Sequence, residues 1–218
     1  MATETIALFG ITGSTGRHFV QFAIKEGYKV KALVRDPDKV DFKNDNLELI
    51  MGSFTEEEAI LKTVSGTDYV VSMAGGKIGN PKKYPTDLML NFVKLLVPIM
   101  EKEGTKVFLY QAGAFSPDMN GTMSTMMKVM RSIVGRMMGI IPNVKDNDNV
   151  IKFLASSQMK SKIIISHPGA LTEKASEKEC HLAKKPPMGS VAFQDLAMCS
   201  LKAIKDESAW GLSHYVAY

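Results

Sequence analysis

Short apolar segments and longer amphipathic segments alternate along most of this chain of 218 residues. The apolar segments predict strands at Thr5–Phe9, Lys29–Val34, Leu47–Met51, Asp68–Met73, Lys106–Tyr110 and Lys162–Ser166. The amphipathic segments predict helices at Arg17–Glu26, Glu56–Val64, Thr86–Glu103, Asp148–Gln158 and Gln194–Lys205, the third kinked or divided at Pro98. Such alternation is typical of βαβ units. We therefore expect a single doubly wound α/β domain over residues 1–218, built on a central parallel β-sheet.

Two segments interrupt this alternation. Residues 115–147 are rich in methionine and have helical character over Thr122–Met138. Residues 173–189 are polar and rich in Lys and Pro, which predicts a loop. Both follow the carboxyl ends of predicted strands, where open α/β sheets bind ligands. We expect segment 115–147 to be a lid over an apolar ligand, a membrane-surface contact, or a surface that packs on the domain or a second subunit.

Composition and charge narrow the function further. The net charge of +4 is too small to indicate nucleic-acid binding, although it suits an anionic cofactor. The two cysteines, Cys180 and Cys199, form neither a disulfide framework nor a metal-ligand cluster, so we expect no metal site. No apolar run reaches the ~18 residues of a transmembrane helix. With no targeting segment ahead of the first strand, we expect a cytoplasmic monomer or homodimer.

The sequence Gly10-Ile-Thr-Gly13-Ser-Thr-Gly16 lies between the first predicted strand and the first predicted helix. Gly10 allows a tight turn, Gly13 lets a diphosphate approach the backbone, and Gly16 lets the helix pack on the strand. Backbone N–H groups at the helix N-terminus would hold the diphosphate together with nearby hydroxyl groups. These hydroxyl groups belong to Thr12, Ser14 and Thr15. The motif in this position predicts a dinucleotide-binding site.

The residue at the end of the second strand selects the coenzyme. NAD-binding domains usually carry Asp or Glu there, about 20 residues beyond the glycines, to bind the ribose hydroxyls. This chain has Arg35, whose guanidinium group suits bidentate pairing with a 2′-phosphate. Alternatively, Arg35 pairs with Asp36 or Asp38 at the surface, and Asp36 binds the ribose. The sequence favours NADP(H) as the cofactor.

Several features together resemble those of the atypical short-chain dehydrogenase/reductase proteins. They are the glycine motif, the sequence Leu33-Val34-Arg35-Asp36-Pro37, the order of strands and helices, and the late helix Gln194–Ile204 with a short strand after it. Within that superfamily the chain is most similar to the NmrA-like group and to the biliverdin reductase B/flavin reductase group. The resemblance covers nearly the whole chain. It implies a Rossmann-type domain, NADPH and hydride transfer to a planar acceptor.

One pattern of that superfamily is missing. Short-chain dehydrogenases typically use a Tyr as general acid/base and a Lys four residues later that lowers its pKa. Here Tyr28, Tyr69, Tyr84 and Tyr110 are followed at that spacing by Ala32, Met73, Leu88 and Ala114. This argues against classical alcohol or ketone chemistry. The flavin reductase group also works without that tyrosine, so hydride transfer stays open.

Further residues are expected along the coenzyme. Gly75 and Gly76 follow the fourth predicted strand and would let the backbone pass close to the nicotinamide ribose. Ser53 lies where the resembled proteins often have Asp near the adenine. Pro168 and Gly169 end the sixth predicted strand and would lie beside the nicotinamide.

Three residues are candidates for the chemistry. Lys152 aligns roughly with a lysine that NmrA-like proteins carry before the Pro-Gly turn; it would bind the nicotinamide ribose, or it is a solvated helix lysine. His167 ends a strand and, with a near-neutral pKa, could donate a proton, or it is a structural hydrogen-bonding group. Gln111 could hydrogen-bond the substrate or the nicotinamide carboxamide.

The leading hypothesis is an NADPH-dependent oxidoreductase. It would transfer a hydride to a small planar and apolar acceptor with conjugated bonds, such as a flavin, quinone, enone or linear tetrapyrrole. The alternative is a non-enzymatic, NmrA-like NADP(H)-binding redox sensor or regulator, which the missing Tyr/Lys pair favours.

Overall fold

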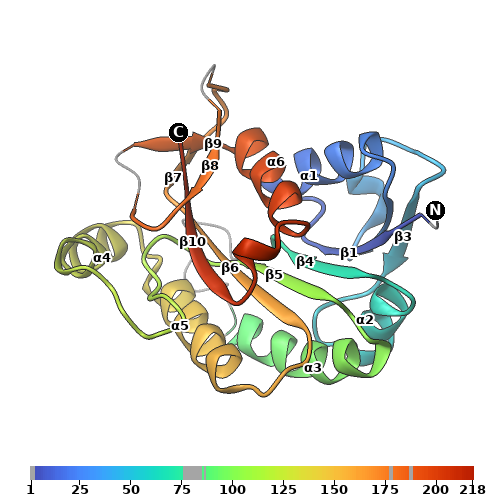
Figure 1. Cartoon of the computed structure of the whole chain (residues 1–218), viewed down its shortest axis with the longest axis horizontal. Coiled ribbons are helices and arrows are strands. Elements are labelled where there is room, and N and C mark those ends of the chain that lie inside the picture. The colour runs from blue at the N-terminus through green and yellow to red at the C-terminus, as the bar shows by residue number, and fades with distance from the viewer. Residues whose placement is uncertain (1–2, 76–84, 86, 177–178, 187–188) are drawn as a thin grey trace.

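A mostly parallel β-sheet runs through the protein. The computed structural model describes residues 3–75, 85, 87–176, 179–186 and 189–218. Its main strands are β1 (Thr5–Phe9), β2 (Lys29–Val34), β3 (Leu47–Met51), β4 (Tyr69–Ser72), β5 (Val107–Gln111), β6 (Lys162–Pro168), β8 (His181–Ala183) and β10 (Leu212–Ala217). Their order in the sheet is β3-β2-β1-β4-β5-β6-β10-β8 (Figure 1). The α/β class predicted from the sequence is confirmed.

One edge of the sheet differs from the prediction. β8 pairs with β10 in antiparallel orientation, whereas all other neighbours in the eight-stranded sheet are parallel. β8 lies in the segment 173–189 that was predicted as a loop, because three residues are too short to show a period. Two more short strands, β7 (Ala170–Thr172) and β9 (Ser190–Ala192), form a separate parallel pair.

Helices cover both faces of the sheet. They are α1 (Ser14–Lys25), α2 (Glu57–Val64), α3 (Leu88–Glu103), α4 (Thr125–Met137), α5 (Ile141–Ser156) and α6 (Phe193–Ala203). Figure 1 shows α1 and α6 on one face, α2, α3 and α5 on the other, and α4 at the outer side beyond α5. Because side chains alternate along a strand, Leu8 packs in the core under α1 and Phe9 in the core under α3.

The order and register of the strands produce a crevice at the carboxyl ends of the strands. Phe9, at the end of β1, pairs with Leu33 of β2 on one side and with Ser72 of β4 on the other. The carboxyl ends of these strands are therefore level. The chain continues from β1 to β2 and β3 in one direction and places β4, β5 and β6 in the other. Ligands of doubly wound sheets bind outside the strand ends where the order reverses in this way.

The predicted helices differ from the structure by one to three residues at one or both ends, the start of α5 excepted, and α3 and α5 differ in a further respect. α3 passes through Pro98 without being divided; Pro98 is exposed, so water can reach the carbonyl group that the missing N–H leaves free. α5 begins at Ile141, well before the predicted start at Asp148, with a proline in its first turn.

The early turns of α5 are polar because they bind other elements. Asp146 is buried and accepts hydrogen bonds from the N–H groups of Met89 (2.8 Å) and Leu90 (3.0 Å), at the start of α3. The hydroxyl group of Tyr110 donates to the side-chain oxygen of Asn147 at 2.6 Å. α5 therefore caps the N-terminus of α3 and is itself hydrogen-bonded to the end of β5.

Candidate coenzyme site

A pocket of about 210 Å³ lies at the carboxyl ends of β1 to β4. Twelve residues line it: Gly10, Thr12, Gly13, Leu33, Val34, Arg35, Gly52, Ser53, Phe54, Met73, Ala74 and Gly75. The structure thus brings together six of the residues predicted to bind the coenzyme, namely Gly10, Thr12, Gly13, Arg35, Ser53 and Gly75. They come from four separate loops, so only the sheet topology makes them neighbours.

The first and last glycines of the motif are required by the chain itself. Gly10 has a φ of 101°, a conformation that side chains other than glycine rarely adopt. A Cβ atom on Gly16 would lie 2.1 Å from the carbonyl oxygen of Gly10. Gly13 differs, since its φ of −79° suits any residue and its Cβ would lie 3.3 Å from that oxygen. Gly13 is exposed to the pocket, so its missing side chain leaves room for a ligand.

The N-terminus of α1 is open toward the pocket. The N–H of Gly13 donates to the carbonyl oxygen of Gly10 at 3.0 Å, which closes the turn. No side chain in the described part of the chain caps this helix, and its first turn contains no acidic residue. Ser14 is exposed there, whereas Thr15 and Gly16 are buried against the strand. Free N–H groups and the positive end of the helix dipole favour an anion.

Arg35 stands alone at the end of β2. Its side chain is exposed, and among the described residues no ion pair involves it. Asp36 instead pairs with Lys39 at 3.0 Å, which lowers the pKa of its carboxyl group, and also accepts from the N–H of Asp38. The alternative in which Asp36 or Asp38 neutralises Arg35 is therefore wrong. The guanidinium group is free to bind an anionic ligand.

The side of the pocket next to β3 is mixed in polarity. The hydroxyl group of Ser53 donates to Glu56 at 2.8 Å, so it is already engaged. Gly52 is needed for packing, because its Cβ would lie 2.4 Å from that of Ala59 in α2. Leu33 and Phe54 add apolar surface that sequence reasoning did not single out. The one feature of the sequence that could have identified them is that they lie near the ends of β2 and β3.

Gln111 and His167 also lie at the carboxyl ends of strands, in β5 and β6, but their side chains point to opposite faces of the sheet. Gln111 pairs in register with Ser166, so the next residue of β6, His167, projects to the other side. The side-chain oxygen of Gln111 and Nε2 of His167 are both buried and have no hydrogen-bond partner among the described residues. Pro168 is buried and Gly169 half-buried after them.

The surroundings of His167 keep its ring neutral. The side chain is fully buried, lies 5.3 Å from the ring of Tyr215, and has its pKa lowered to about 4, chiefly by burial. Its near-neutral pKa, expected from the sequence, is therefore wrong. Nδ1 lies 3.3 Å from the carbonyl oxygen of Gly113, which only accepts, so Nδ1 carries the proton. Nε2 is then unprotonated at pH 7.

Lys152 lies apart from the pocket. It is exposed on α5, on the face opposite the buried Val150 and Leu154 and beyond the turn that contacts β5. No hydrogen bond or ion pair of the described residues involves it, as expected for a solvated helix lysine. Gly76 lies outside the described residues.

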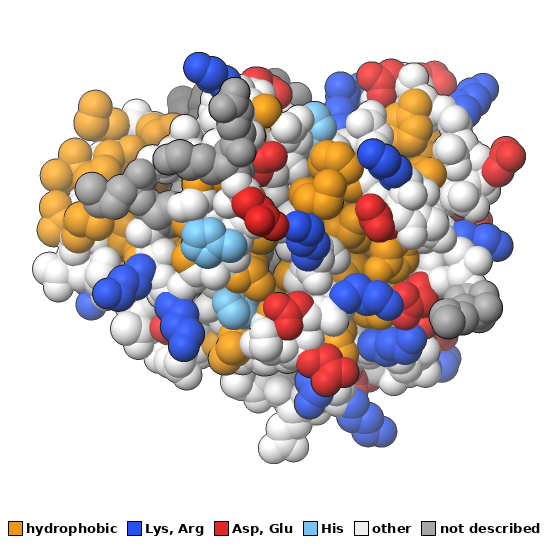
Figure 2. All heavy atoms as spheres, turned by 45° about the horizontal axis from the view of Figure 1, so that its top comes forward, with side chains coloured by type: hydrophobic (Ala, Val, Ile, Leu, Met, Phe, Trp, Pro, Cys, Tyr) orange, Lys and Arg blue, Asp and Glu red, His pale blue; other side chains and the backbone are white. Residues whose placement is uncertain are grey.

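Segment 115–147 contains α4, most of whose apolar residues are exposed. Only Met127 and Gly135 of this helix are buried. Large apolar side chains project outward at Met126, Val129, Met130, Ile133, Met137 and Met138. Figure 2 shows a hydrophobic surface at its left edge, where α4 lies. These exposed side chains do not pack on their own domain, so that part of the alternative is wrong for them; packing on a second subunit stays a prediction.

An open α/β sheet with a glycine turn ahead of an uncapped helix defines a dinucleotide-binding protein of the Rossmann type. The model of a family described as NAD(P)H-binding matches residues 10–207. The chain belongs to this NAD(P)H-binding family.

Curated relatives match part of the chain. Photosystem II assembly factor Ycf39 of Cyanophora paradoxa is 33% identical over 86 residues, covering 38% of this chain and 27% of the relative. Pinoresinol reductase 2 of Arabidopsis thaliana is 30% identical over 125 residues, covering 53% of this chain and 38% of the relative. The matches thus span well under half of these relatives' lengths.

Solved structures match the whole fold. A Bacteroides thetaiotaomicron protein, described provisionally as an epimerase, aligns with a TM-score of 0.80 at 18% identity, over 100% of this chain and 98% of the other. ChuY, an anaerobillin reductase of Escherichia coli O157:H7, aligns with a TM-score of 0.72 at 16% identity, over 99% and 97%. At these identities the likeness concerns the fold.

Among the described residues, no helix combines the length and apolar character needed to cross a membrane.

Proposed function

We propose that this protein is an NADPH-dependent oxidoreductase that reduces a small, planar acceptor with conjugated bonds. The observation that carries the proposal is the pocket in which an uncapped helix N-terminus and the unpaired Arg35 lie together. Two anion-binding groups at one strand edge suit a coenzyme with a diphosphate and a 2′-phosphate. We propose that residues 1–218 act as one coenzyme-binding domain, with segment 115–147 beside the acceptor.

Each part of the pocket has a role in holding the coenzyme. The N–H groups at the start of α1 would hold the diphosphate, with the exposed hydroxyl groups of Thr12 and Ser14 beside it. Arg35 would bind the 2′-phosphate and so select NADPH over NADH. Leu33 and Phe54 would flank the adenine. A Cβ atom on Gly75 would meet no atom of the described residues within 4 Å, so the backbone there would leave room for the nicotinamide ribose.

The chemistry needs little from the protein beyond position and a dry site. When bound, NADPH supplies the hydride. Gln111, whose buried side-chain oxygen lacks a partner among the described residues, would hydrogen-bond the carboxamide or the acceptor. We assign the proton to water rather than to His167, because the proton of the neutral ring is on Nδ1 and donated to Gly113. A reductase role is supported by the similarity to pinoresinol reductase 2.

The test is loss of NADPH absorbance by the purified protein with a panel of flavin, quinone, enone and tetrapyrrole acceptors. We expect turnover with at least one acceptor. Arg35→Ala should raise the KM for NADPH about 10-fold or more and leave the KM for NADH nearly unchanged, since it removes one charged pairing. Lys102→Ala is the control, because Lys102 is an exposed cation on α3 and is not among the residues that line the pocket. Equal effects on NADPH and NADH would contradict the role of Arg35.

A second candidate is a non-enzymatic NADP(H) sensor. It is favoured by the lack of a Tyr/Lys pair and by the similarity to an assembly factor. A melting temperature that rises with NADPH, without turnover of any acceptor in the panel, would favour the sensor over the reductase.

A further inference from the structure

A second and larger pocket lies away from the coenzyme pocket. It has a volume of about 520 Å³ and is formed by α4, the loop before it and the start of α5. Four cationic side chains line it: Lys128, Arg131 and Arg136 from α4, and Lys145 from α5. Among the described residues, no acidic side chain lines it. Pockets of this size suit small molecules.

Three of these cations are unpaired within the described part of the chain. Arg131 makes a bidentate pair with Asp148, at 2.5 and 3.1 Å, and donates to the carbonyl oxygen of Phe115. It therefore holds the loop, α4 and α5 together. Lys128, Arg136 and Lys145 are exposed and take part in no ion pair of the described residues. The pocket keeps about three uncompensated positive charges, on a frame that Arg131 fixes.

The sequence around the pocket reinforces this charge. Residues 119–145 contain no Asp or Glu, so no acidic residue of this stretch offsets the charge of these cations. Lys128, Arg131 and Ser132 are three and four residues apart, so the helix places them on one face. Asp118, just before this stretch, accepts from the N–H groups of Asn120 and Thr122 and so closes its own turn.

We propose that this pocket binds a phosphate group, or another dianion of similar size, as a site separate from the coenzyme pocket. A concave site with three unpaired cations and a hydroxyl group from Ser132 matches an anion with several acceptor oxygens. The phosphate belongs either to a soluble ester or to a lipid headgroup. The exposed apolar side chains of α4 make the second source worth testing.

The first test is calorimetric titration of the full-length protein with inorganic pyrophosphate in the presence of saturating NADP⁺. Under the proposed function NADP⁺ would occupy the glycine turn, and the titration would then report other sites. We expect one pyrophosphate per chain. Lys128→Ala or Arg136→Ala should weaken binding about 5-fold each, and the triple variant with Lys145→Ala about 50-fold or more, since each removes a charged contact.

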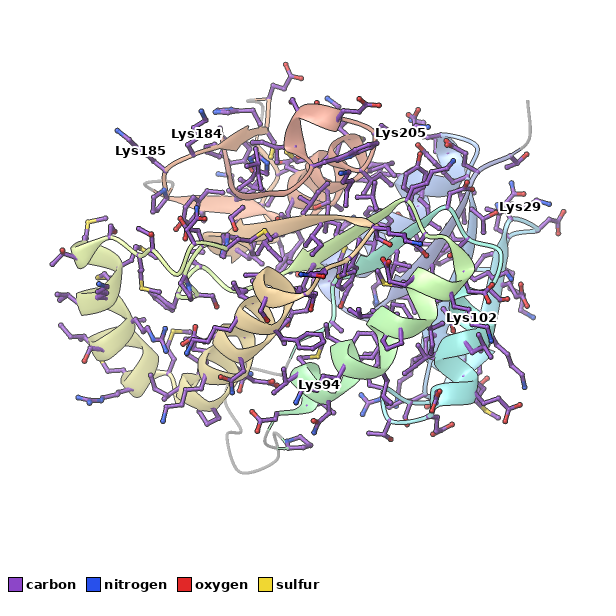
Figure 3. The ribbon with its side chains drawn as sticks, turned by 60° about the horizontal axis from the view of Figure 1, so that its bottom comes forward. Lys29, Lys94, Lys102, Lys184, Lys185 and Lys205 are labelled. Carbon is purple, nitrogen blue, oxygen red and sulfur yellow. The ribbon has the colours of Figure 1, made fainter. Side chains whose placement is uncertain are left out.

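The matched control is Lys29→Ala/Lys102→Ala, two exposed lysines on β2 and α3 (Figure 3). It should change pyrophosphate affinity less than about 2-fold, because neither lysine lines the pocket and salt screens exposed charges that are well separated from a ligand. All the replaced side chains are exposed, and unchanged melting temperatures will show that the variants remain folded. Absence of pyrophosphate binding in the presence of NADP⁺, or binding that the triple variant retains, would overturn the proposal.

A second arm separates the two sources of phosphate. Vesicles of phosphatidylcholine with phosphatidic acid are compared with vesicles of phosphatidylcholine alone in a sedimentation assay. If the ligand is a headgroup, the protein should sediment with the acidic vesicles, and the triple variant should lose this. If the ligand is soluble, pyrophosphate should bind and neither vesicle should retain the protein. Acidic vesicles that retain the triple variant as well as the wild type would exclude this pocket as the lipid contact.

Discussion

Replacing Gly16 with alanine should lower the melting temperature by about 6–12 °C. The added Cβ would meet the carbonyl oxygen of Gly10 at 2.1 Å, and both atoms belong to one tight turn. Relieving that contact moves α1 away from β1, and overpacking of this kind costs about 3 kcal/mol. For a chain of this length each kcal/mol corresponds to about 2–4 °C. Thermal unfolding without coenzyme measures the effect.

Replacing Gly13 with alanine should have the opposite effects: it should leave the melting temperature nearly unchanged and weaken the binding of NADPH. Gly13 has φ and ψ of −79° and 159°, so alanine adopts its conformation without strain. Its Cβ would be 3.3 Å from the Gly10 oxygen, a contact that a small shift relieves. We expect a melting temperature within about 2 °C of the wild type. The methyl group would face the pocket and clash with a bound diphosphate, so NADPH affinity should fall at least about 10-fold, since overpacking of this kind costs about 1.4 kcal/mol or more.

The pair therefore separates the needs of the fold from those of the ligand. Both variants make one chemical change in one turn, so each is the control for the other. The interpretation fails if Gly13→Ala melts as early as Gly16→Ala, or if Gly13→Ala binds NADPH as tightly as the wild type.

Acid should destabilise the protein through His167. The folded-state pKa is about 4, below the usual value of 6.5, because the fully buried ring is costly to charge. The unfolded chain therefore binds a proton that the folded protein does not, between these two pH values. The stabilisation is fully present above pH 6.5 and is lost as the pH falls toward 4. The loss amounts to about 3 kcal/mol.

Urea unfolding between pH 7 and pH 4 measures this loss. His167→Asn removes the titrating group, so its free energy of unfolding should fall less steeply over this range, whatever its value at pH 7. His181→Asn, at an exposed position on β8, is the control for the replacement of a histidine by asparagine. Equal slopes for wild type and His167→Asn would show that His167 is already charged or accessible to water in the folded protein.

Most of the predicted strands were recognisable because they are short apolar runs that are largely buried on both faces, whereas β3, at the edge of the sheet, is only partly buried. Five of the six predicted strands agree with the structure to within one residue at each end, and the sixth, Lys162–Ser166, continues to Pro168. The start of α5 was not predictable. Asp146 and Asn147 look like loop residues in the sequence, but in the structure they bind the N-terminus of α3 and the hydroxyl group of Tyr110. Polar residues that serve tertiary contacts hide the helical period.

The amino-acid sequence by itself determined the alternation of strands and helices, the glycine turn and the arginine after β2. These are local features, set by apolar periods and by the conformational freedom of glycine at adjacent positions. Only the tertiary structure decided which distant loops meet. Register at the ends of β5 and β6 turned His167 and Gln111 to opposite faces, burial made His167 neutral, and the packing of α4 against α5 gathered the cations of the second pocket. Side-chain direction, pKa and electrostatic potential depend on neighbours remote in sequence, which no local pattern contains.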